Sequence, residues 1–197
     1  EDCGELLASH PHAVEYLQRI ADNALRLDRM ALDVLTFSRV TRGELKLARV
    51  DLDKLVRDLV EHYASMQAPG ADIRIDPLLP VTGHEPSLTQ IMSNLLSNAI
   101  KFVPVGEIPK IHVWTEQRGD EVRIWVEDSG VGIDPRYQHR LFRMFERIHP
   151  DSNYHGTGVG LAVVRKAAER MHGTVGVESD GKTGSRFWVQ LGGVRSA

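Results

Sequence analysis

The segment Asn94-Leu-Leu-Ser-Asn98-Ala-Ile-Lys101-Phe102 decides the fold of this chain. It closes a stretch, about Pro86–Phe102, whose apolar residues recur at helical spacing and therefore predict a helix. Asn94 and Asn98 are four residues apart and share one helix face, and Lys101 lies one turn beyond. Two amide oxygens and an ammonium on one face can hold a hydrated Mg²⁺ and the phosphates that it bridges. A polar stripe on a half-buried helix accounts for the same residues, so this segment alone decides no function.

A glycine-containing group, Asp128-Ser-Gly130-Val-Gly132-Ile133, directly follows the predicted strand Glu121–Glu127. Glycines at alternate positions let a planar ligand approach the backbone closely. The carboxylate of Asp128 can then accept a hydrogen bond from an exocyclic amine such as that of adenine. An ordinary glycine-rich turn is the alternative interpretation.

A third group, Gly156-Thr157-Gly158-Val159-Gly160-Leu161, opens the predicted helix Gly160–His172. Glycines at this place allow backbone N–H groups to face an anion, and the helix N-terminus adds a favourable dipole. Glycines before a helix are common, so this pattern is weak when taken alone.

The remaining elements predict an α+β chain, in which one long helix precedes a mixture of strands and helices. Asp51 is a candidate N-cap for a helix that runs to about Met66. The other predicted strands are Leu45–Arg49, Asp72–Asp76, Lys110–Glu116, Thr174–Glu178 and Ser185–Leu191.

The long helix is predicted from Val14 to Val40, with apolar residues at helical spacing and Thr41-Arg42-Gly43 at its end. Its polar residues form a face that we expect to meet solvent. That face includes Arg19, Asp22, Arg26, Asp28 and Asp33. We therefore divide the chain into a helical region, residues 1–43, and an α+β domain, residues 44–197.

In their order and separation, the three groups resemble the N-box and the two glycine boxes of one ATPase superfamily. Its members are histidine kinases, DNA gyrase, the ninety-kilodalton heat-shock chaperone and the mismatch-repair ATPases. The stretch Leu141-Phe-Arg-Met-Phe-Glu-Arg147 and the closing Gly184-Ser185-Arg-Phe187 are similar to further motifs of that superfamily. The resemblance covers about Leu45–Leu191 and implies a two-layer α/β sandwich. Its sheet would be mixed and mostly antiparallel, with helices on one face.

Within the superfamily, the chain looks closest to the histidine kinases. The hydrolases place a glutamate general base four residues before the metal-binding asparagine, and here that position is Asn94, which cannot take a proton. The stretches Phe145–His149 and Tyr154–Gly158 resemble the kinase subgroup associated with phytochromes.

The resemblance implies ATP and Mg²⁺ as cofactors and a role for each motif residue. Asn98 would ligate Mg²⁺, and Asn94 and Lys101 would serve phosphoryl transfer. The other residues implied to contact the nucleotide are Asp128, Gly130, Gly132, Ile133, Arg147, Gly156, Thr157, Gly158, Gly160, Leu161 and Ser185. His149 and His155 are expected to be solvated loop residues.

Composition and charge narrow the classes of protein to which the chain can belong. A net charge of −3 gives no basic footprint for nucleic acid, and no apolar run reaches the length of a membrane span. A single cysteine, Cys3, excludes an internal disulfide and fits a reducing cytoplasm. Residues 176–183 match the phosphate-binding pattern that ends Gly-Lys-Thr, but the sequence after them alternates like a strand rather than a helix. We therefore interpret that match as accidental.

The kinase resemblance also implies an acceptor histidine on a helical hairpin, and none of the nine histidines has that setting. Residues 1–12 resemble the end of the first hairpin helix and the turn after it, so we expect the acceptor helix to be missing, or the acceptor to lie on another chain. The implied partners are a response regulator receiver domain and a second copy that packs on the long helix. We expect that helix to self-associate or to be partly disordered; folding back onto the α+β domain is the alternative. A regulatory nucleotide- or partner-binding module of the same fold, without kinase activity, is the second hypothesis.

Overall fold

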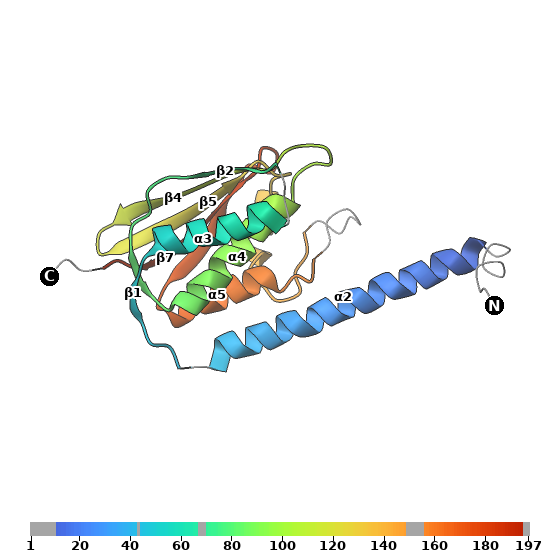
Figure 1. Cartoon of the computed structure of the whole chain (residues 1–197), viewed down its shortest axis with the longest axis horizontal. Helices are drawn as coiled ribbons and strands as arrows, with labels where there is room; N and C mark the ends of the chain where they lie inside the picture. Colours follow the sequence, from blue (N-terminus) through green and yellow to red (C-terminus); the bar gives the residue numbers. More distant parts are fainter. Residues whose placement is uncertain (1–10, 43, 67–69, 149–155, 195–197) are drawn as a thin grey trace.

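The computed structural model describes residues 11–42, 44–66, 70–148 and 156–194. A long helix, α2, leads to an α+β body in which the strands form one layer and the shorter helices another (Figure 1). The helices are α2 (Pro11–Arg42), α3 (Leu52–Met66), α4 (Glu85–Lys101), the 3₁₀ helix η1 (Pro135–Arg140) and α5 (Gly160–Arg170). The strands are β1 (Ala48–Val50), β2 (Asp72–Ile75), β3 (Val81–Gly83), β4 (Lys110–Arg118), β5 (Glu121–Asp128), β6 (Thr174–Glu178) and β7 (Ser185–Gly192).

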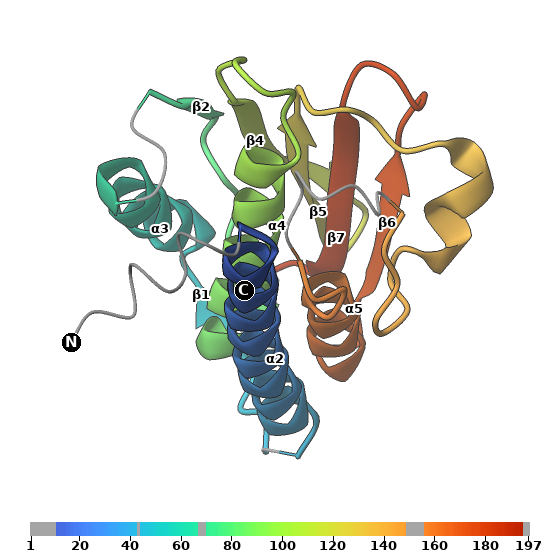
Figure 2. The same cartoon turned by 90° about the vertical axis from the view of Figure 1, so that its right-hand side faces the viewer.

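The main sheet has five strands in the order β2-β4-β5-β7-β6. Only the β2–β4 pair is parallel, and the other three pairs are antiparallel. The helices α3, α4 and α5 lie on one face of this sheet (Figure 2). A mixed, mostly antiparallel sheet with helices on one face confirms the predicted α+β sandwich. A separate two-stranded sheet joins β1 to β3.

The core lies between the sheet and the helices α3, α4 and α5. Alternate residues of the central strands point inward, so Val122, Ile124 and Val126 are each at most 1 % exposed. The predicted apolar face of α4 meets them, and its buried members are Leu88, Ile91, Met92, Leu95, Leu96 and Ala99. Each fully buried side chain of this size contributes about 1.5–3 kcal/mol to folding. This packing turns the opposite, amide-bearing face of α4 toward the cavity described below.

Two short elements escape the sequence analysis. β3 has three residues and ends in Gly83, so this strand is too short to show an alternation of apolar and polar residues. η1 begins after Asp134, whose side chain accepts a hydrogen bond from the Arg136 N–H, and Pro135 occupies its first turn. The predicted strand Leu45–Arg49 is also shifted, because pairing with β3 begins only at Ala48.

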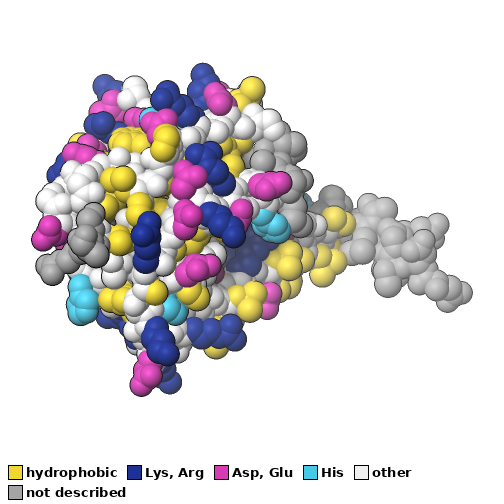
Figure 3. Space-filling view, turned by 60° about the vertical axis from the view of Figure 1, so that its left-hand side comes forward, with side chains coloured by type: hydrophobic (Ala, Val, Ile, Leu, Met, Phe, Trp, Pro, Cys, Tyr) yellow, Lys and Arg dark blue, Asp and Glu magenta, His cyan; other side chains and the backbone are white. Residues whose placement is uncertain are grey.

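The helix α2 touches the body along α5, where the Arg170 guanidinium donates to the Val40 carbonyl. Val40 at the foot of its apolar stripe packs against the core, but Leu17, Ile20 and Leu27 are between 51 % and 67 % exposed. Figure 3 shows hydrophobic side chains along the part of the helix that leaves the body. Within the described ranges, the structure has no helix long and apolar enough to cross a membrane.

The match to a phosphate-binding loop at residues 176–183 is accidental, as predicted. Lys182 lies in the turn between β6 and β7, where its backbone N–H donates to the Asp180 carboxylate over 2.8 Å. A strand follows this turn instead of a helix, so no helix N-terminus faces the lysine.

Candidate functional site

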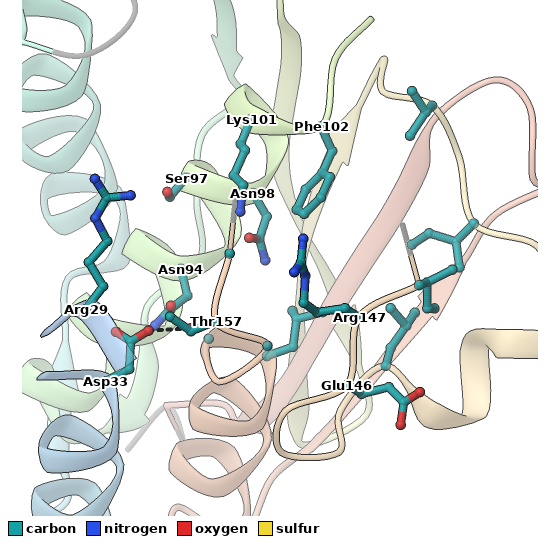
Figure 4. A pocket seen from close by; sticks show the side chains of 18 of the residues that line it. Arg29, Asp33, Asn94, Ser97, Asn98, Lys101, Phe102, Glu146, Arg147 and Thr157 are labelled. Atoms are coloured by element: carbon teal, nitrogen blue, oxygen red, sulfur yellow. Dashed lines mark hydrogen bonds between the residues drawn. The ribbon is translucent and has the colours of Figure 1, made fainter. Parts of the chain in front are cut away.

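A cavity of about 750 Å³ lies between α4, the ends of β5 and β7, the segment before α5, and α2 (Figure 4). It brings together residues from all three glycine- and asparagine-containing groups. The predicted residues that line it are Asn94, Asn98, Lys101, Asp128, Gly132, Ile133, Arg147, Gly156, Thr157, Gly158, Gly160, Leu161 and Ser185. Gly130 stands just behind this wall, where its N–H donates to the Asp128 carboxylate.

Asp128 lies at the end of β5, opposite Ser185 at the start of β7. It is only 9 % exposed, and its Oδ1 accepts from the N–H groups of Gly130 (2.9 Å) and Ser185 (3.2 Å). Burial raises the pKa of Asp128 to about 6, and these two hydrogen bonds oppose that rise. Because both bonds use Oδ1, Oδ2 is the oxygen that can accept from the amine of a ligand.

The polar face of α4 forms the neighbouring wall. The Asn94 amide nitrogen donates to the Gln90 carbonyl over 2.8 Å, so the amide oxygen is turned toward the start of α5. A Cβ at Gly160 would lie 2.7 Å from this oxygen, and a Cβ at Gly156 would lie 2.5 Å from the Lys101 Nζ. A Cβ at either position would therefore displace the end of the Asn94 or Lys101 side chain, and glycine leaves both polar groups in place.

Lys101 is the central cation of the cavity. Burial lowers the pKa of its ammonium to about 8; Arg147 and Arg29 lower it further, while Asp33 raises it. Repulsion among these cations favours an anion between them, because a bound phosphate would relieve it. Figure 4 shows Lys101 on α4, between Arg29 on one side and Arg147 on the other.

The stretch that carries Arg147 is tied to the segment before α5, which we call the lid (Gly156–Val159). The Phe145 N–H donates to the Gly158 carbonyl over 2.9 Å, and Arg140 pairs with Glu146 over 2.7 Å. This arrangement holds both the phenylalanine-containing stretch and the lid against the cavity. His149 and His155, which we expected to be solvated loop residues, lie outside the described residues.

One wall of the cavity was missed by the sequence analysis, because it belongs to α2. Three residues that we expected to meet solvent, Asp22, Arg26 and Asp33, line the cavity, together with Asn23, Leu25 and Arg29. The Thr157 hydroxyl of the lid donates a hydrogen bond to the Asp33 carboxylate. A charged helix face facing a cavity has the same spacing as one facing water, so the sequence holds no signal for this contact.

The donor set of the cavity fits Mg²⁺. Among the described residues there is no group of three or more histidine, cysteine, aspartate or glutamate side chains that could hold a metal. Mg²⁺ does not need one, because it keeps several waters and binds one or two protein oxygens together with substrate phosphates. The side chains of Asn94 and Asn98 on the cavity wall can supply such oxygens.

Residues 83–193 match the family described as histidine kinase-, DNA gyrase B-, and HSP90-like ATPases. The chain is 34% identical over 190 residues to cyanobacterial phytochrome A of Nostoc sp., covering 96% of this chain and 24% of that protein. It is 31% identical over 194 residues to the sensor histidine kinase GacS of Pseudomonas protegens, covering 92% of this chain and 21% of that protein. The chain thus spans about a quarter or less of the length of these relatives.

Solved structures show the same likeness. Full-length ShkA in complex with AMPPNP is similar with a TM-score of 0.73 and 30% identity, over 93% of this chain and 39% of that chain. The mycobacterial sensor histidine kinase MprB shares the fold with a TM-score of 0.66 at 23% identity, over 77% of this chain and 100% of that chain. The family match spans the wall of Asn94 and Lys101, the Asp128 site and the lid. The chain therefore belongs to the histidine kinase-, DNA gyrase B- and HSP90-like ATPase family.

Proposed function

We propose that this chain binds Mg·ATP and transfers the γ-phosphoryl group to a histidine supplied from outside it, and thence to a response regulator receiver domain. The observation that carries the proposal is that one cavity joins Asp128, the amides of α4, Lys101 and the lid. The likeness to GacS, a sensor histidine kinase, supports it over the other activities of the family. On this proposal residues 44–197 form the ATP-binding catalytic domain.

Each wall of the cavity has a part in binding. Asp128 accepts from the adenine amine, while Gly132, Ile133 and Ser185 border the base. Lys101 and Arg147 neutralise phosphate charge, and the lid, with Gly160 and Leu161 at the start of α5, closes over the phosphates. Mg²⁺ held by Asn98, with Asn94 beside it, would neutralise charge that develops on the phosphate oxygens. Catalysis then comes from positioning and electrostatics rather than from covalent chemistry on this chain.

The cavity favours transfer over hydrolysis. Asn94 cannot act as a base, and it occupies the position at which the related hydrolases have their glutamate. Two carboxylates of the cavity are already engaged: Glu146 pairs with Arg140, and Asp33 accepts from Thr157. Both carboxylates thus have protein partners, and the absence of a glutamate at position 94 is the observation that favours transfer.

The exposed apolar stripe of α2 supports a dimer. Apolar residues at helical spacing along one side of a long helix bury their surface best against other helices, as in a four-helix bundle. We include residues 1–43 in this dimerisation region. The second copy would cover exposed residues such as Leu17, Ile20 and Leu27.

The test is phosphorylation of an acceptor hairpin from a related sensor kinase, added to this chain with ATP and Mg²⁺. We expect an acid-labile phosphoryl group on the hairpin, which Asn98→Ala abolishes. Saturable ATP binding without transfer would overturn kinase activity and favour the regulatory module. Steady ATP hydrolysis that depends on Asn98, without transfer, would instead favour an ATPase.

A further inference from the structure

The α2 wall of the cavity carries its own charges. Asp22, Arg26, Arg29 and Asp33 follow one another at three- or four-residue spacing, so they share one face of the helix. In Figure 4, Arg29 and Asp33 stand on the α2 side of the cavity, and Arg147 stands on the opposite side. A nucleotide bound in this cavity is therefore enclosed by a helix outside the region that matches the family, residues 83–193.

The charge on Arg29 is not satisfied by its neighbour Asp33. Arginine and aspartate four residues apart on a helix commonly pair with each other. Here Asp33 instead accepts from Thr157 of the lid. Over the ranges that the structure describes, the Arg29 guanidinium has no ion pair or hydrogen bond, although it lines the cavity. A guanidinium directed to an anion site without a protein partner suits a phosphate, which it can bind bidentately.

Arg29 also lies at the end of the cavity where the last phosphate of a bound nucleotide would be. Asp128, which we assign to adenine, lies at the end of the sheet, whereas α2 forms a wall next to Asn94 and the lid. Lys101 stands between Arg29 and Arg147 in Figure 4, and the charge of Arg29 contributes to lowering its pKa. A nucleotide with its base at Asp128 and its inner phosphates at Lys101 therefore directs its last phosphate toward α2.

We propose that Arg29 binds the terminal phosphate of ATP, so that helix α2 supplies a residue that distinguishes ATP from ADP. This inference rests on the proposed function, since it uses the same nucleotide site. It makes the contact between α2 and the catalytic domain dependent on the γ-phosphate. Transfer of that phosphate removes the ligand of Arg29 and weakens the hold of α2 on the nucleotide-bound domain.

The test compares AMPPNP, a non-hydrolysable ATP analogue, with ADP by calorimetric titration in the presence of Mg²⁺. The variants are Arg29→Ala and Arg29→Lys. Arg19→Ala is the matched control, because Arg19 is an exposed arginine of the same helix that does not line the cavity. Alanine favours the helix, so none of these changes should unfold α2, and circular dichroism verifies this.

We expect Arg29→Ala to weaken AMPPNP binding roughly tenfold, the usual effect of losing a charged hydrogen bond, with ADP binding within about twofold of the parent. Arg29→Lys should retain part of the preference for AMPPNP, and Arg19→Ala should leave both affinities unchanged. Equal losses for the two nucleotides, or no loss for either, would overturn the role of Arg29. A parent chain that binds neither nucleotide would instead overturn the proposed function itself.

Discussion

The Thr157 hydroxyl donates a hydrogen bond to the Asp33 carboxylate and so joins the lid to α2, across 124 positions of sequence. Asp33 also favours the charged form of Lys101. One carboxylate of the helix thus acts on both the lid and the phosphate-binding cation. The position of α2 and the state of the nucleotide site are therefore physically connected.

Replacing Asp33 by alanine should loosen this connection. We expect faster amide hydrogen exchange in the lid and the start of α5, residues 156–162, and in the second half of α2. Asp28→Ala is the control, because Asp28 is on the same helix but does not line the cavity. Hydrogen exchange read by mass spectrometry checks this, and identical protection in the two variants would refute the connection.

The pKa of Lys101 predicts how nucleotide affinity depends on pH. With a pKa of about 8 in the free protein, Lys101 loses its positive charge as the pH rises through that value. Bound phosphate raises this pKa, so AMPPNP affinity should fall above about pH 8, by at most about tenfold per pH unit. Calorimetric titrations across this range should show a much flatter curve for Lys101→Arg, because arginine stays charged. A parent curve as flat as that of the variant would contradict the assignment.

The raised pKa of Asp128 implies that this residue lowers the stability of the fold at neutral pH while it serves nucleotide binding. Its folded pKa of about 6 exceeds the ordinary value of 3.8, so its contribution to stability is full below about pH 4 and is lost as the pH rises through 6. Asp128→Asn should therefore raise the free energy of unfolding by roughly 1–3 kcal/mol at about pH 7.5. Urea denaturation should show this gain shrinking toward pH 4. A variant that is less stable than the parent at neutral pH would show that the negative charge of Asp128 does not destabilise the fold.

Replacing Gly160 by alanine should weaken nucleotide binding without unfolding the chain. A Cβ there would lie 2.7 Å from the Asn94 amide oxygen, which ends a side chain that can move aside. Gly160→Ala should therefore displace Asn94 and weaken Mg²⁺-dependent AMPPNP binding several-fold, while the melting temperature changes little. Gly192→Ala is the control, because the nearest atom to its Cβ would be 4.0 Å away. Unchanged binding in Gly160→Ala would show that the Asn94 oxygen has no part in the site.

Most of the fold could be predicted because its signals are local. The buried face of α4 and the alternation in β4 and β5 follow directly from residue spacing. The parallel pairing of β2 with β4 and the place of β7 between β5 and β6 depend on packing between distant segments, which no local pattern specifies. The strand β3 was missed because three residues cannot show a period.

The residues of the site also divide into those that local sequence patterns predict and those that only tertiary packing brings to the cavity. Asp128, Asn98 and the lid glycines occur in groups with recognisable spacing, and they line one cavity. Arg29 and Asp33 occur in a charged helix face that looks like any solvated face. Only the docking of α2 along α5 brings them to the cavity, and that depends on tertiary contacts such as the one between Arg170 and Val40.

Calorimetric titration of AMPPNP with Mg²⁺, on the parent chain and on Asp128→Ala, tests the central claim most directly. We expect saturable binding to the parent and its loss in the variant, because the adenine amine loses its acceptor. A folded parent that binds no nucleotide, or a variant that binds as tightly as the parent, would contradict the assignment of this cavity to ATP.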